Sequence, residues 1–83
     1  MRKVPVGVLV QFAPNAIAHP LSVTWEDGRV YPVEEVLDLR PARTSPDRFR
    51  YTVRIYNQET YLYRSGDRWH MESNQENPPQ KHL

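Results

Sequence analysis

Hydrophobic and polar residues alternate along much of this chain, most regularly between positions 48 and 56. One side of that segment carries Phe49, Tyr51, Val53 and Ile55. Successive side chains of a β-strand point to opposite faces, so this alternation predicts a half-buried strand. The side chains between them, Arg50 and Arg54 among them, are expected to face solvent.

Five further strand-like runs are separated by turn signals and cover roughly residues 3–12, 21–25, 30–40, 60–64 and 68–72. Asp27-Gly28, between the runs that begin at 21 and 30, is a strong hairpin signal. Pro32 cannot donate to a strand ladder, so the third run is predicted to be a bent strand with a bulge near Glu34-Glu35. A single helical turn in the same run is the alternative.

The predicted fold class is all-β. Short loops after Tyr56 and Arg64 predict an antiparallel meander of the last three strands. Six short strands are too few for two packed sheets, which favours one domain, residues 1–73, built as a strongly bent antiparallel sheet or partly closed barrel. Residues 74–83 have almost no apolar content and are expected to form a disordered tail. The predicted core contains Val8, Val10, Leu21, Val23, Trp25, Val33, Leu37, Leu39, Phe49, Tyr51, Val53, Ile55, Leu62, Trp69 and Met71.

Five short motifs follow one another in this chain: Pro-Leu-x-Val-x-Trp at 20–25, Gly-Arg at 28–29, Tyr-x-Val-x-x-Val-Leu at 31–37, Tyr-x-Val-x-Ile at 51–55 and Arg-Trp at 68–69. In this pattern the chain resembles a family of short uncharacterised bacterial proteins. The resemblance covers about residues 20–70. It implies a small all-β fold and carries no known activity, cofactor or catalytic residue.

Charge is unevenly distributed, although the 83 residues have a formal net charge of only +1. Residues 26–38 hold five acidic residues against one arginine, whereas residues 40–68 hold seven arginines against three acidic residues. Arginine favours stacked and bidentate contacts, and a codon bias of the genome is the alternative explanation for its abundance. No apolar run approaches the roughly 18 residues of a membrane span. We therefore expect a cytoplasmic protein that has no membrane partner.

The residue types needed for catalysis or metal binding are not grouped along the chain. There is no cysteine, and His19, His70 and His82 lack metal-ligand spacing. The serines form no nucleophile motif, and the three glycines are scattered. Glu34 and Glu35 are neighbours in a predicted strand, so they point to opposite faces and cannot share a proton. We predict a non-enzymatic protein with no metal and no cofactor.

The solvent side of the last three predicted strands is the candidate binding surface. This surface, the Arg/Tyr face, consists of Arg50, Arg54, Tyr56, Tyr61, Tyr63, Arg68 and His70. Rings interleaved with cations favour single-stranded nucleic acid, because bases stack on the rings while arginines contact phosphates. Tyrosine and arginine are also enriched at protein interfaces, which favours a protein partner or self-association through the same face. A third interpretation is that cross-strand Tyr–Arg pairs only stabilise the sheet.

Overall fold

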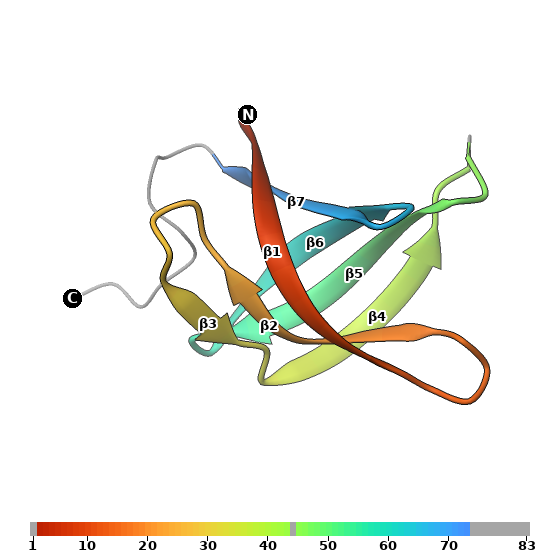
Figure 1. The fold of residues 1–83 in the computed structure, drawn as a ribbon, viewed down its shortest axis with the longest axis horizontal. Coiled ribbons are helices and arrows are strands. Elements are labelled where there is room, and N and C mark those ends of the chain that lie inside the picture. The colour runs from red at the N-terminus through yellow and green to blue at the C-terminus, as the bar shows by residue number, and fades with distance from the viewer. Residues whose placement is uncertain (1, 44, 74–83) are drawn as a thin grey trace.

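The computed structural model describes residues 2–43 and 45–73, and over these residues it is all-β with no helix (Figure 1). The predicted disordered tail, residues 74–83, lies outside the described residues. No described helix is long and apolar enough to cross a membrane. The strands are β1 (Arg2–Phe12), β2 (Ala18–Thr24), β3 (Val30–Pro32), β4 (Glu35–Pro41), β5 (Arg48–Ile55), β6 (Gln58–Ser65) and β7 (Arg68–Ser73).

All seven strands form one antiparallel sheet in the order β3-β2-β1-β7-β6-β5-β4, which Figure 1 shows strongly curled into a half-barrel. The predicted bent sheet and the meander of the last three strands are both confirmed. The long strand β1 joins two parts of the sheet, because its residues 2–6 pair with β7 and its residues 7–12 pair with β2.

The prediction of one bent strand over residues 30–40 is wrong. These residues form two strands, β3 and β4, which lie on opposite edges of the sheet. The chain crosses between these edges at Val33 and Glu34. The Val33 amide donates to the carbonyl of Leu21 in β2 at 2.9 Å, and the Glu34 amide donates to the carbonyl of Arg54 in β5 at 2.8 Å. These two bonds hold the edges together at one end of the half-barrel.

The core fills the concave side of the sheet. Alternation on β5 is confirmed, since Tyr51, Val53 and Ile55 are at most 2% exposed. The Tyr51 hydroxyl donates to the Ala18 carbonyl at 2.7 Å, which ties β5 to the start of β2. The buried cluster comprises Val4, Val23, Trp25, Tyr31, Tyr51, Val53, Ile55, Leu62 and Met71.

Two predicted core residues, Leu21 and Leu37, are instead 39% and 36% exposed. Each occupies a β-bulge, where two residues oppose one and the alternation shifts by one position. Leu21 has no partner of its own on β1, because the register runs from the pair Leu9–Ser22 directly to the pair Val10–Pro20. Leu37 is passed over in the same way on β4, opposite β5, so the bulge predicted at Glu34-Glu35 lies further along the strand.

Candidate binding face

Cross-strand pairing places most of the Arg/Tyr face on the convex side of the sheet. Arg50 on β5 lies opposite Tyr63 on β6, and Tyr63 lies opposite His70 on β7. Directly paired residues point to the same face, so these three side chains form one row across three strands. Arg40 on β4 extends the row beyond Arg50.

The rings of this face stack mainly on partners within the protein. The guanidinium carbon of Arg50 lies 4.4 Å from the ring centroid of Tyr61, a cation–π contact. The Tyr63 ring stacks on His70 at 4.9 Å with an interplanar angle of 7°, and it lies 6.3 Å from Tyr61. The Arg50 Nε is buried without a hydrogen-bond partner. Ring surface for an incoming base is therefore reduced.

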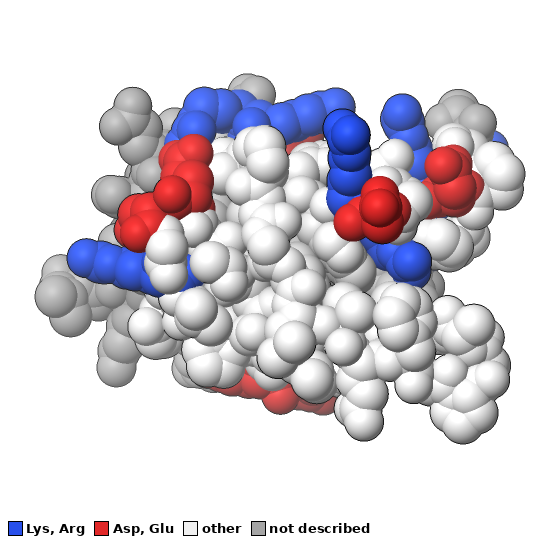
Figure 2. Space-filling model, in the orientation of Figure 1, with Lys and Arg blue, Asp and Glu red and all other residues white. Residues whose placement is uncertain are grey.

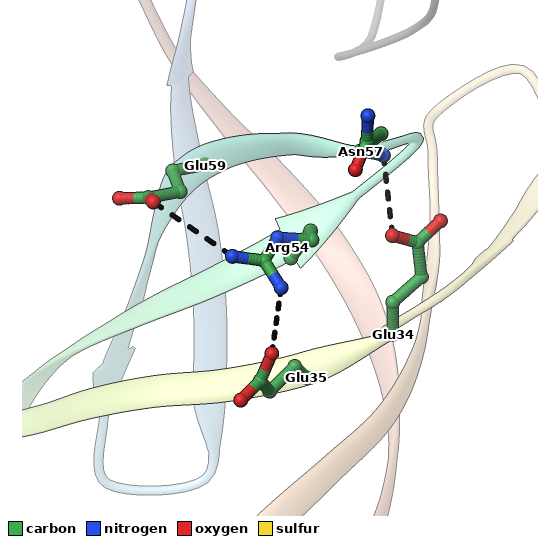
Figure 3. A network of polar contacts seen from close by, with 5 residues as sticks. All are labelled: Glu34, Glu35, Arg54, Asn57 and Glu59. Carbon is green, nitrogen blue, oxygen red and sulfur yellow. Dashed lines mark hydrogen bonds and ion pairs between the residues drawn. The ribbon is translucent and has the colours of Figure 1, made fainter.

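Arg54 is held by two carboxylates (Figure 3). Its Nη1 lies 2.6 Å from Glu35 Oε1 on β4, and its Nη2 lies 3.9 Å from Glu59 Oε2 on β6. Glu34, beside it, accepts a hydrogen bond of 3.2 Å from the Asn57 amide in the β5–β6 turn. The positive charge of Arg54 is therefore compensated within the protein.

Tyr56 differs from the other predicted face residues because β5 ends at Ile55. Tyr56 and Asn57 form a two-residue turn with positive φ angles of 50° and 59°. Such a turn matches the twist of the strands that it joins. The Tyr56 ring packs edge-on against the buried ring of Tyr31 at 5.5 Å, so it contacts the core at the end of the sheet. Tyr56 is therefore not part of the row that Arg50, Tyr63 and His70 form on the convex face.

Arginines gather at the end of the face near the β6–β7 turn. Arg48 and Arg68 both lie opposite Ser65, one on each side of β6. Arg40 and Arg50 lie opposite each other in the next row. We call these residues the basic half: Arg40, Arg48, Arg50 and Arg68.

Acidic residues occupy the other end of the same face. Glu35 and Glu59 flank Arg54, and Asp38 lies opposite Thr52. Glu72 lies opposite Lys3 on β1. We call these residues the acidic half: Glu35, Asp38, Glu59 and Glu72. Sequence reasoning missed them as site residues, although Glu59 shares the alternation phase of Tyr61 and Tyr63 and could have been found from it.

A shallow pocket of about 290 Å³ opens between the acidic half and the tyrosines. It is lined by Thr52, Glu59, Thr60, Tyr61, Tyr63 and Glu72. Burial, followed by the hydrogen bond and charge of Glu72, raises the pKa of Tyr63 above its ordinary value. Carboxylates and ring faces around one pocket suit a cationic group.

His70 is influenced by a different neighbour. Burial, and then the positive charge of Lys3, lower its pKa below the ordinary value of 6.5.

Within the described residues, no group of three or more His, Asp and Glu side chains could hold a metal ion. No known protein family, curated protein or solved structure matches this chain. The resemblance to short bacterial proteins therefore stays a prediction.

Proposed function

We propose that this domain is a non-enzymatic protein-interaction module that acts in the cytoplasm and binds its partner through the convex face of β4–β7. The observation that carries the proposal is that arginines gather at one end of this face and carboxylates at the other, where they surround Arg54, with Tyr61 and Tyr63 across the middle. The two ends meet at Arg40 and Asp38, which form an ion pair at 2.7 Å. A protein surface with the opposite arrangement of charge would be both attracted to this face and oriented on it.

A nucleic-acid strand fits this arrangement less well because its charge is uniformly negative. A strand that crossed the whole face would meet Glu59 and Glu72 as well as the arginines. The charge of Arg54 is already compensated. Single-stranded nucleic acid nevertheless remains the second candidate, because three arginines of the basic half, Arg48, Arg50 and Arg68, surround the Tyr63–His70 stack. The fourth, Arg40, pairs with Asp38 at 2.7 Å.

The pocket beside Tyr61 suggests how the partner is anchored. An arginine or lysine side chain of the partner would place its charge near Glu59 and Glu72 and its carbon chain against the tyrosine rings. Arg50 already shows such a contact within the chain, 4.4 Å above the Tyr61 ring. Tyrosine and arginine contacts of this kind are frequent hot spots of protein interfaces.

NMR titration with N-acetyl-arginine amide tests the pocket, and N-acetyl-citrulline amide serves as the uncharged control. We expect the arginine probe alone to shift the ring resonances of Tyr61 and Tyr63. Glu72→Gln should weaken this binding, whereas Glu26→Gln should not, because Glu26 lies outside the pocket and pairs with Arg2. Equal shifts with both probes would contradict the assignment of a cationic partner group.

Single-stranded DNA and RNA oligonucleotides test the second candidate at about 50 and 200 mM salt. The proposal predicts no salt-dependent binding. If an oligonucleotide binds at low salt and binding disappears when Arg50, Arg54 and Tyr61 are all changed to serine, the partner is a nucleic acid and the proposal fails. We expect that triple variant to stay folded, because none of the three side chains belongs to the buried core. Arg50 and Arg54 are only half-buried, and Tyr61 is exposed on the convex face.

A further inference from the structure

A second surface lies on the long strand β1, away from the Arg/Tyr face. Residues Arg2–Val6 of β1 have strand partners on β7, and residues Gly7–Phe12 have partners on β2. Among the described strands, none pairs with the β7-facing edge of β1 from Gly7 to Phe12. Figure 1 shows β1 and β2 continuing together beyond β7 as a hairpin. This edge therefore has backbone groups available to another strand.

The same edge lacks the features that normally prevent strand pairing, such as charged side chains, prolines and short length. From Val4 to Trp25 the chain has no Lys, Arg, Asp or Glu, and residues 6–12 contain no proline. Figure 2 accordingly shows a broad area without charged residues on this side of the molecule. On this edge, Leu9 is 63% exposed and Phe12 is 59% exposed.

The two outer edges of the sheet are protected in the expected way. Strand β4 carries charged side chains at Glu35, Asp38 and Arg40, and it ends in Pro41. Strand β3 has only three residues and ends in Pro32. Edge protection is thus present on β3 and β4 and missing on residues 7–12 of β1, which indicates that this edge is covered in the working state of the protein.

A groove lies directly beside the edge. The groove, of about 260 Å³, is lined on the hairpin side by Val8, Val10 and Phe12. Arg64, Asp67 and Trp69 line its other side, with the Arg64 guanidinium carbon 5.7 Å from the Trp69 ring centroid. An added strand would continue the sheet and place apolar side chains in this groove.

We infer that the strand that covers this edge is the same edge of a second copy, which makes the protein a symmetric dimer. An antiparallel pairing about a two-fold axis at Leu9 would place Leu9 against Leu9 on the convex side. It would also place Val8 against Val10 on the concave side. The alternation of the two strands then matches, and no like charges meet because this edge has none.

The dimer is weak. With the axis at Leu9, residues 7–11 of each copy can pair, because Phe12 would face Val6, which already pairs with Trp69. Five residues of strand span about 17 Å, so the area buried is well below the roughly 800 Å² per partner of a standard interface. Sedimentation velocity from about 10 µM to 1 mM should therefore show a concentration-dependent increase from monomer to dimer. A protein that stays monomeric over this whole range would overturn the proposal.

Charge at Leu9 tests the register. Leu9→Lys and Leu9→Glu should each abolish the dimer, because like charges would meet on the two-fold axis. Mixing the two variants should restore a dimer. Val30→Lys is the matched control: Val30 is 58% exposed on β3 and lies outside the edge, so this variant should dimerise like the parent. Circular dichroism must show that all three variants are folded.

The results also separate this dimer from self-association through the Arg/Tyr face. The triple serine variant at Arg50, Arg54 and Tyr61 should dimerise normally. If it is monomeric while the Leu9→Lys variant still dimerises, the convex face is the contact and the β1 edge is not. Failure of the β1 dimer leaves binding of the arginine probe unaffected, because the probe reports only the pocket at Tyr61.

Discussion

Removing one hydroxyl group, in Tyr51→Phe, tests how the half-barrel is held together. Tyr51 is 2% exposed, and its hydroxyl donates to the Ala18 carbonyl at 2.7 Å across 33 positions of the chain. Ala18 is 1% exposed, so water does not readily replace the lost donor. The substitution keeps the aromatic ring, which lies 5.3 Å from the Trp69 ring. Its effect therefore reports the hydrogen bond between β5 and β2.

The expected cost combines two effects. The net value of a hydrogen bond is about 1 kcal/mol, and a buried carbonyl left without a donor raises the cost to about 1–3 kcal/mol. For a domain of this size, each kcal/mol lowers the melting temperature by about 4–8 °C. A small domain is stable by roughly 5 kcal/mol or a little more, so the variant should still fold.

Urea unfolding followed by tryptophan fluorescence measures this change. With an m value of about 1 kcal/mol/M, the midpoint should fall by about 1–3 M while m stays constant. The control is Tyr61→Phe, because Tyr61 is 46% exposed and its substitution should change stability by less than about 0.5 kcal/mol. An unchanged midpoint for Tyr51→Phe would show that the β1–β2 hairpin does not dock on β5 as described.

Three further substitutions test other parts of the fold. Trp25→Ala removes a side chain that is 3% exposed, and it should cost about 3–5 kcal/mol and abolish the cooperative melt. Gly28→Ala meets no atom within 4 Å but places alanine at φ 88°, so urea unfolding should show a loss of about 1–2 kcal/mol from backbone strain alone. Because the pKa of His70 is lowered on folding, the unfolded state binds more protons, and stability should fall as the pH drops below about 6.5. His70→Gln should flatten this pH dependence in urea melts, and an NMR titration of His70 should give a pKa below the ordinary value.

The sequence predicted those parts of the fold that depend on neighbouring residues. Alternation assigned Tyr51, Val53 and Ile55 to the core because β5 is regular along its whole length. The hairpin at Asp27-Gly28 was predictable from turn chemistry: Gly28 adopts φ 88°, and the Asp27 carboxylate accepts a hydrogen bond from the Arg29 amide at 3.0 Å. Short loops then determined the order of the last three strands.

Features that depend on pairing between distant segments were not predictable in this way. The division of residues 30–40 into β3 and β4 depends on the bonds of Val33 and Glu34 to β2 and β5, which no local pattern encodes. Val4 is fully buried because β1 pairs with β7, its partner from the other end of the chain. The Arg/Tyr face was assigned correctly in phase on β5, β6 and β7. Its acidic half was missed: alternation places Glu59 and Glu72 on the same outer side, but neither was predicted to be a binding residue.

The exposed leucines of this protein have two different causes. Leu21 and Leu37 are exposed because each is the extra residue of a bulge, and such bulges bend the strands of a curled sheet. Leu9 is different, since it faces outward by ordinary alternation between Val8 and Val10 and is not itself the extra residue of the bulge beside it. A polar residue would satisfy the fold equally well at that position. The bend of the sheet therefore accounts for Leu21 and Leu37 but not for Leu9, and a contact with another strand is the explanation that its position on the free edge supports.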